Sequence, residues 1–270
     1  MDLAGLRGLR LSSVDIRGRR GTQELISILH LSDLHGKSFR SSQPSLGQLL
    51  GDLEPDLVVL TGDLLDERSR TTDGVKDLLA VLPPAPAFFV PGNHDPACRL
   101  YPALLNLLAI HGVQPLVNEA VVFTKGDIRI RIVGLDDPLH GAPDLSLLEA
   151  PEDRPPHPGA AEFAATLVAA HSPTLGRRNA RRAGVKPALL PLAARCGVDL
   201  VLCGHTHGGQ VRLPWIGALF IPGQRLFPRY VRGVYSMGGT SMHVTAGLGT
   251  SHLPVRFTCP PEVAFIHWRP

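Results

Sequence analysis

The chain lacks the signals that would place it across a membrane or in an oxidising compartment. No window approaches 18 consecutive apolar residues, so no transmembrane helix is predicted. Arginines at positions 7, 10 and 17 interrupt the N-terminal stretch, which therefore does not resemble a signal peptide. The four cysteines form no C-x-x-C pair, which predicts reduced thiols rather than a disulfide framework. We expect a cytoplasmic protein, either free or peripheral to the inner face of the membrane.

The chain also has little net charge and few aromatic residues. The formal net charge is +3, and aromatic residues make up 5% of the chain. No basic patch is interleaved with aromatic residues, so nucleic acid is not an expected partner. The sequence carries no signal for a particular oligomeric state.

Apolar residues, in contrast, are sufficient for a full core. They make up 44% of the 270 residues, which is typical of a globular protein. We predict a single domain over residues 1–270, with its core from about residue 24 to the end and with residues 1–23 as an N-terminal edge strand or extension. The proline-rich stretch 151–158 is expected to be a surface excursion.

Apolar runs of strand length alternate with helical patterns along much of the chain. Nine such runs are predicted to be β-strands: Ile26–Leu31, Leu57–Thr61, Ala87–Val90, Ala120–Thr124, Ile128–Val133, Thr166–Ala170, Val198–Cys203, Ser241–Ala246 and Val263–Trp268. Four segments place apolar residues three and four apart, which predicts helices: Gln43–Leu53, Asp73–Leu82, Leu100–His111 and Pro187–Cys196. This alternation favours a layered α/β fold.

Two further segments lead to predictions about solvent-facing strands. Strict alternation over Ile128–Ile132 predicts an antiparallel strand with one solvated face. The stretch Val14–Arg20 is interpreted as a solvated edge strand.

Polar side chains with metal-binding atoms directly follow five of the predicted strands. In each case the apolar run ends and an Asp, Asn or His comes next, as in the GHTHGG stretch at 204–209. Because strand ends of one parallel sheet lie about 5 Å apart, these side chains are predicted to meet at one rim. The set is Asp33, His35, Asp63, Asn93, His94, His171, His205 and His207.

Each of these residues alone has an ordinary explanation. An Asp after a strand is usually a turn former or a helix cap. A lone His is more often a hydrogen-bonded residue than a ligand. The repeated placement at strand ends is what these explanations do not account for.

The number of candidate ligands indicates two cations. Three carboxylate or amide groups and four imidazoles exceed one tetrahedral zinc site and suit two divalent ions that share a carboxylate. Carboxylate and imidazole ligands without thiolate favour manganese, with iron or zinc as alternatives. Two such ions can hold a bridging hydroxide, orient a phosphate and stabilise the attacking and leaving oxygens of a displacement at phosphorus.

Five short motifs occur in the order SDLH, LTGDLLD, GNHD, AHSP and GHTHGG. Together they resemble the calcineurin-like metallophosphoesterases, and the resemblance runs from about Ile26 to the C-terminus. It implies a four-layer αββα sandwich and hydrolysis of a phosphoric ester. The stretches GGQVRLPWIGALFIPG and GLGTSHLPVRFTCPPEV look like a narrower bacterial branch of membrane-associated phosphodiesterases, some of which hydrolyse UDP-2,3-diacylglucosamine.

The resemblance also implies roles for the matching residues. Seven of them match the metal ligands of the family: Asp33, His35, Asp63 and His207 for the first ion, with Asp63 bridging, and Asn93, His171 and His205 for the second. His94 would not bind metal, but would lie over the phosphate and protonate the leaving oxygen or stabilise charge there. Asp95 is expected to fix the His94 ring by a hydrogen bond, with a turn-forming aspartate as the alternative.

The motifs favour a diester over a phosphoprotein as substrate. The protein-phosphatase branch carries GNHE and an Arg after its Gly-Asp block, whereas this chain has GNHD and GDLLDE. By analogy, this favours a phosphodiester or diphosphate bond in a small-molecule, nucleotide-sugar or lipid-linked substrate. Two alternatives stay open: a phosphomonoesterase and a non-catalytic metal-binding scaffold of the same fold.

The segment 211–232 mixes aromatic residues with arginines. One interpretation is a packed β-excursion with ordinary surface arginines. The other is a lip beside the metal site that makes peripheral contact with an anionic membrane. The residues concerned are Trp215, Phe220, Phe227, Tyr230, Arg212, Arg225, Arg229 and Arg232.

Overall fold

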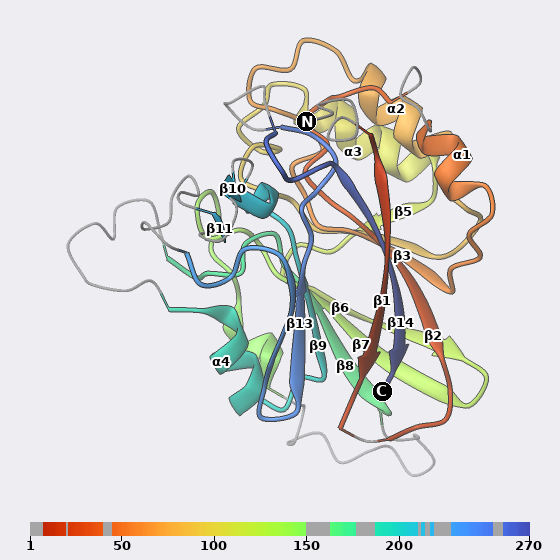
Figure 1. Ribbon diagram of the computed structural model, residues 1–270, viewed down its shortest axis with the longest axis vertical. Coiled ribbons are helices and arrows are strands. Elements are labelled where there is room, and N and C mark those ends of the chain that lie inside the picture. Colours follow the sequence, from red (N-terminus) through yellow and green to blue (C-terminus); the bar gives the residue numbers. More distant parts are fainter. Residues whose placement is uncertain are drawn as a thin grey trace.

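Two mixed β-sheets lie face to face and helices flank them (Figure 1). The computed structural model describes residues 8–19, 21–39, 45–149, 163–176, 187–209, 212–213, 217–218, 228–250 and 256–270. Each of the two large sheets has six strands. A small antiparallel pair is formed by β10 (Arg212–Leu213) and β11 (Gly217–Ala218).

Sheet A has the strand order β1-β14-β2-β3-β4-β5. Its strands are β1 (Arg10–Arg17), β14 (Glu262–Arg269), β2 (Ile26–Leu31), β3 (Leu57–Leu60), β4 (Ala87–Phe89) and β5 (Val113–Pro115). Strands β2 to β5 run parallel, whereas β14 runs antiparallel to β2. Strand β1 takes the edge position that was predicted for the N-terminal segment.

Sheet B has the strand order β12-β13-β9-β8-β7-β6. Its strands are β12 (Gly233–Met237), β13 (Thr240–Val244), β9 (Leu200–Cys203), β8 (Ala165–Ala169), β7 (Ile128–Gly134) and β6 (Glu119–Lys125). The four central strands are parallel, and β6 and β12 pair antiparallel at the two edges.

Alternating side chains of the strands divide the core into layers. In β2, Leu29 and Leu31 face the helices, while Ile26 and Ile28 face sheet B. Because both faces are covered, four of the six residues of the strand are apolar, and the exceptions are Ser27 and His30. The three helices on the outer face of sheet A are α1 (Leu46–Leu50), α2 (Asp73–Leu79) and α3 (Tyr101–Ile110).

Helix α4 (Leu189–Arg195) covers the outer face of sheet B, on the opposite side of the molecule (Figure 1). The order of layers is therefore helices, sheet A, sheet B, helix. The α/β class and the four-layer αββα arrangement are both confirmed. All nine predicted strands and all four predicted helices are present, with ends shifted by a few residues.

The prediction for residues 128–132 is wrong in part. Strand β7 pairs antiparallel with β6 but parallel with β8. Its second face is also not simply solvated, because half-buried Arg131 donates from Nη1 to the carbonyl of Leu147 at 2.7 Å. That carbonyl belongs to the 3₁₀ helix η2 (Leu145–Leu148), which covers this part of the strand.

Other sequence predictions concern the cysteines, residues 151–158 and membrane-spanning helices. All four cysteines are free thiols, as predicted. The excursion at 151–158 lies outside the described residues. Among the helices that the structure describes, none combines the length and apolar character needed to cross a bilayer.

Candidate metal centre

The predicted ligand residues meet at one rim, but two sheets build it rather than one. In sheet A, ligand residues follow β2, β3 and β4, and in sheet B they follow β8 and β9. The prediction of a single parallel sheet is therefore wrong. The carboxyl ends of the strands still coincide, because the two sheets pack face to face through a shared apolar core.

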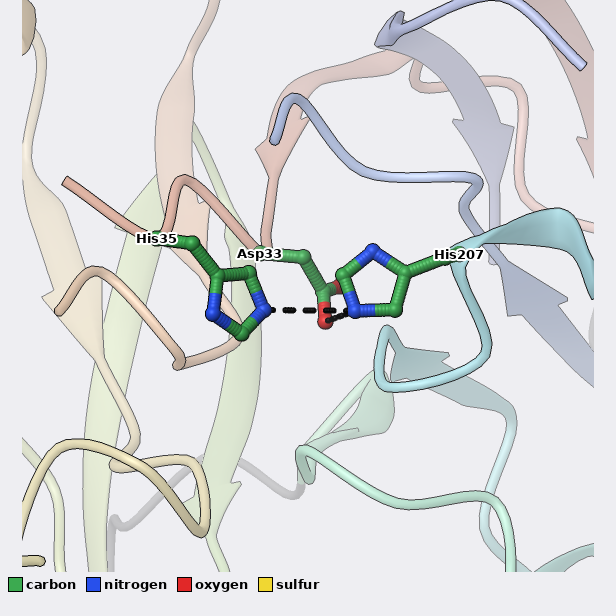
Figure 2. Close-up of side chains that lie close together, drawn as sticks. All are labelled: Asp33, His35 and His207. Atoms are coloured by element: carbon green, nitrogen blue, oxygen red, sulfur yellow. Dashed lines mark hydrogen bonds and ion pairs between the residues drawn. The ribbon is translucent and has the colours of Figure 1, made fainter. Parts of the chain in front are cut away.

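Asp33, His35 and His207 form a first cluster, and their side chains point toward one another (Figure 2). Nε2 of His207 lies 3.2 Å from Nε2 of His35 and 3.5 Å from Oδ1 of Asp33. Asp33 is fully buried, and both of its carboxylate oxygens accept the backbone N–H of His205, at 3.0 and 3.1 Å. A sheet A carboxylate thus holds the start of the His205–His207 loop of sheet B.

Asp63, His171 and His205 form a second cluster. Nε2 of His171 lies 3.2 Å from Oδ2 of Asp63 and 3.1 Å from Nδ1 of His205. Nδ1 of His171 lies 2.7 Å from the carbonyl oxygen of Thr61 and must donate to it, because a carbonyl only accepts. In the neutral ring this leaves the Nε2 lone pair directed into the cluster.

The carboxylate of Asp63 lies between the two clusters. Its Oδ2 faces His171 of the second cluster and lies 3.6 Å from Nε2 of His35 in the first. Its Oδ1 accepts the backbone N–H of His94 at 2.8 Å. One carboxylate can therefore contact ligands on both sides of the centre.

The pKa values follow from burial and from these short contacts. Burial lowers the pKa of His171, but the carboxylates around it, Asp63 first among them, together raise it well above its ordinary value. Burial raises the pKa of Asp63, but the neighbouring imidazoles, His171 first among them, together lower it well below its usual range. Burial raises the pKa of Asp33. A carboxylate oxygen and an imidazole lone pair at 3.2 Å need a proton or a cation between them.

The backbone of the site is unusually strained. Of the seven described non-glycine residues with positive φ, five belong to the predicted site. Such conformations cost energy and persist where the surrounding structure imposes them, often at functional sites. The five are Asp33, His35, Asp63, His205 and His207.

Two glycines allow the backbone to approach the buried carboxylates. A Cβ on Gly92 would lie 2.1 Å from Oδ1 of Asp63. A Cβ on Gly204 would lie 2.4 Å from Oδ2 of Asp33. Any side chain at either position would displace a carboxylate of the site.

Asp95 has the turn-forming role that was the alternative to fixing the His94 ring. Its two oxygens accept backbone N–H groups of the turns around Asp63 and Gly92 at 2.7 to 2.9 Å, so it holds these turns in place. Burial raises the pKa of Asp95 to about 7. The carboxylates beside the His94 ring are instead those of Asp66, with Oδ2 3.9 Å from Nδ1, and Asp63, with Oδ2 4.0 Å from Nε2.

Asp66 was not predicted as a site residue, although it ends the LTGDLLD motif. Its Oδ2 also lies 3.4 Å from Nδ1 of His35, and together with His35 and His94 it forms a third cluster of potential ligand atoms. The interaction with His35 lowers the pKa of Asp66 to about 2. Asp66 is therefore ionised, and its Oδ2 lies close to the Nδ1 atoms of both His35 and His94.

Asp137 was also missed. It is buried, its Oδ1 accepts the backbone N–H of Leu139 at 2.8 Å, and its Oδ2 has no hydrogen-bond partner in the described part of the chain. Burial raises its pKa to about 6. It follows β7 after two intervening residues, so the strand-end criterion would have found it with a slightly wider window.

The donor set fits divalent cations. Oδ1 of Asn93, which follows β4 on the same rim, is buried with no hydrogen-bond partner among the described residues. A buried amide oxygen without a donor is rare and is readily explained by a cation. The carboxylate and imidazole atoms of the two clusters, together with this amide oxygen, are ligands that manganese, iron and zinc accept.

The predicted lip at 211–232 lies mostly outside the described residues, including Trp215, Phe220, Phe227 and Arg225. Of its described side chains, Tyr230 is buried, with its ring 5.0 Å from that of Tyr235.

Comparisons with known proteins identify the family. The sequence profile of the calcineurin-like phosphoesterases matches residues 26–209. The chain is 33% identical over 245 residues to the phosphodiesterase YaeI of Escherichia coli (strain K12), covering 88% of this chain and 80% of YaeI. It is 30% identical over 247 residues to the metallophosphoesterase YkuE of Bacillus subtilis (strain 168), covering 87% and 76%. It is 29% identical over 256 residues to a transmembrane protein with a metallophosphoesterase domain from Bos taurus, covering 88% and 52%. The chain therefore belongs to the calcineurin-like phosphoesterase family and is a metallophosphoesterase, a hydrolase of phosphoric ester bonds.

Proposed function

We propose that this protein is a phosphodiesterase that cleaves a phosphodiester or diphosphate bond with two divalent cations held at the shared rim of the sheets. The observation that carries the proposal is the position of Asp63. Its Oδ2 lies 3.2 Å from His171 in one cluster and 3.6 Å from His35 in the other. A carboxylate in this position suits a ligand shared by two cations.

The ligands follow from the two clusters. Asp33, His35 and His207 would hold one cation, His171 and His205 would hold the other with Asn93, and Asp63 would be available to both. When bound, the cations supply Lewis-acid activation of water and of the phosphoryl group. Manganese is the proposed metal, with iron or zinc as alternatives.

His94 is the proposed catalytic residue of the chain itself. Its backbone N–H donates to Asp63 at 2.8 Å, which fixes the residue beside the shared carboxylate. Its ring packs edge-on against that of His35, with centroids 5.0 Å apart. Burial lowers the pKa of His94. We propose that this ring donates a hydrogen bond or a proton to the leaving oxygen, while Asp66 orients it.

A diester is favoured over a monoester because the relative YaeI is named a phosphodiesterase and because this chain carries GNHD rather than GNHE. We propose a small-molecule, nucleotide-sugar or lipid-linked diester. Contact of 211–232 with a membrane surface would accompany a lipid-linked substrate.

The test compares bis(4-nitrophenyl) phosphate with 4-nitrophenyl phosphate, using metal-free protein loaded with Mn²⁺, Fe²⁺ or Zn²⁺. We expect metal-dependent hydrolysis, with a higher kcat/KM for the diester. A higher kcat/KM for the monoester would identify a phosphomonoesterase. Metal binding with no turnover of either compound would support the scaffold alternative, and both outcomes would overturn the proposal.

A further inference from the structure

Three side chains near the C-terminus, Arg256, Cys259 and Glu262, bind the backbone behind the first cluster. We refer to them as the C-terminal clamp. They belong to the motif GLGTSHLPVRFTCPPEV, whose residues have no part in the proposed function described so far. Their contacts show what this motif does in the fold.

Among the described residues, the guanidinium of Arg256 donates to backbone carbonyls, and all three of its nitrogens take part. Its Nε and Nη2 bind the loop 246–249, and its Nη1 reaches the loop that carries His207. The acceptors are Gly249 (2.8 Å from Nε), Ala246 and Gly247 (2.7 and 3.2 Å from Nη2), and His207 and Cys259 (3.4 and 3.5 Å from Nη1).

The loop 246–249 lies directly against Asp33. The backbone N–H of Gly249 donates to the carbonyl of Asp33 at 2.5 Å, and that of Leu248 donates to the carbonyl of Ser32 at 2.9 Å. A Cβ on Gly247 would come within 2.6 Å of Cβ of Asp33. A displacement of this loop would therefore move Asp33.

The other two members of the clamp hold the same loops. Sγ of Cys259 donates to the carbonyl of His207 at 3.5 Å. Oε2 of Glu262 accepts the backbone N–H of Ala246 at 2.7 Å, and Oε1 accepts Nη2 of Arg232 at 2.8 Å. The clamp thus joins the backbone at His207, which follows sheet B, to the loop that supports Asp33, which follows sheet A.

We propose that Arg256 is a positioning residue that sets the separation of Asp33 and His207 and thereby the affinity of the first cluster for its cation. This inference rests on the proposed function. Groups that orient metal ligands without touching the metal typically change metal affinity by about 10- to 100-fold. Lysine cannot replace Arg256, because its ammonium presents its donors from one point and cannot span both loops.

The test titrates Mn²⁺ into metal-free Arg256→Lys by calorimetry, with the dimanganese signal in electron paramagnetic resonance as a second readout. The matched control is Arg131→Lys, since Arg131 also donates to a backbone carbonyl but contacts η2. In Arg256→Lys we expect one of the two Mn²⁺ affinities to fall by about 10- to 100-fold. At limiting Mn²⁺ the coupled signal should give way to that of isolated ions. The control should match the wild type in both measurements.

Three results would overturn the clamp proposal while leaving the proposed function intact: unchanged Mn²⁺ affinities, equal weakening at both sites, or a loss that the control shares. Failure of the wild type to bind two Mn²⁺ would instead remove the proposed function. If Arg256→Lys does not fold, Cys259→Ala replaces it. This variant removes the Sγ bond to His207 and keeps the Arg256 guanidinium, so a severalfold loss at one site is expected, and wild-type affinities would overturn the proposal.

Discussion

The two sheets bring different chemistry to the rim that they share. Sheet A supplies both carboxylates of the two ligand clusters together with His35, whereas sheet B supplies imidazoles alone. Each cluster nevertheless contains residues that follow both sheets. The carboxylates of the two clusters therefore come from one side of the rim, and imidazole donors come from both sides.

In the two clusters that contain Asp33 and Asp63, neither sheet therefore supplies all of the potential ligands. The two sheets contact each other through an apolar core, which leaves their ends to be aligned by a few polar contacts. One is the hydrogen bond from His171 to the carbonyl of Thr61, and another is the buried pair of His30 in β2 and His243 in β13, with Nδ1 atoms 3.1 Å apart. The relative position of the two sheets therefore also sets the positions of the residues in the two clusters.

The largest effect is expected from Asp63→Ala, which removes the carboxylate that faces both clusters. We expect kcat/KM for bis(4-nitrophenyl) phosphate to fall on the order of 10³-fold or more, because both cations lose a ligand. The control is Asp56→Ala. Asp56 binds Lys125 and the backbone N–H of Ser27 at the other end of sheet A. Activity of Asp63→Ala within about tenfold of wild type would contradict a shared ligand.

His94→Ala should separate catalysis from metal binding. We expect kcat to fall by about 10²- to 10⁴-fold, because the leaving oxygen loses its proton or hydrogen-bond donor. Metal content, measured by plasma mass spectrometry after gel filtration, should stay at two ions per chain. Loss of an ion together with activity would show that His94 is a ligand.

The imidazoles of sheet B can be compared directly in His207→Ala and His171→Ala. Each variant should retain about one ion, since each removes a nitrogen donor from one cluster. The metal-free His171→Ala protein should also be less stable by about 1 kcal/mol, because the bond to Thr61 is lost. Urea unfolding and metal analysis would check this, and two tightly bound ions in either variant would be incompatible with the assignment.

The last prediction concerns the dependence of stability on pH and the contact between the sheets. Burial lowers the pKa of His243 to about 4 and that of His30 well below its ordinary value. The two histidines therefore bind protons less readily in the folded state than in the unfolded state. Their contribution to the free energy of unfolding is complete above the unfolded pKa of about 6.5 and is lost as the pH drops toward 4. Between pH 7.5 and 5, His243 accounts for about 2 kcal/mol of this loss.

His243→Gln tests this titration in metal-free protein. The free energy of unfolding, measured in urea at the two pH values, should decline less in the variant than in the wild type. An equal decline would show that the acid sensitivity arises elsewhere.

Much of the fold was predictable because both faces of the central strands are covered. Covered strands are rich in apolar residues, so β3 and β9 appear as apolar runs, and β2 departs from one only at Ser27 and His30. The strands that were missed lack this pattern. Strand β5 has one buried residue in three, and β12 has none fully buried.

The candidate ligand residues of the site were predictable, but the sheets and contacts that position them were not. Each predicted ligand directly follows a strand, which local sequence reveals. The sheet that each strand joins depends on packing between distant segments, so the rim was assigned to one sheet. The partner of the His94 ring depends on the path of two turns, which place Asp66 rather than Asp95 beside it. Arg256 binds backbone carbonyls, which no pattern of residue types reveals.

The central claim is that residues following two separate sheets hold two cations with Asp63 between them. Anomalous scattering from a crystal grown with excess Mn²⁺ tests it most directly. The account predicts two manganese peaks per chain, one on each side of the Asp63 carboxylate. A single peak, or none, with Asp33 and His205 directed away from each other, would contradict it.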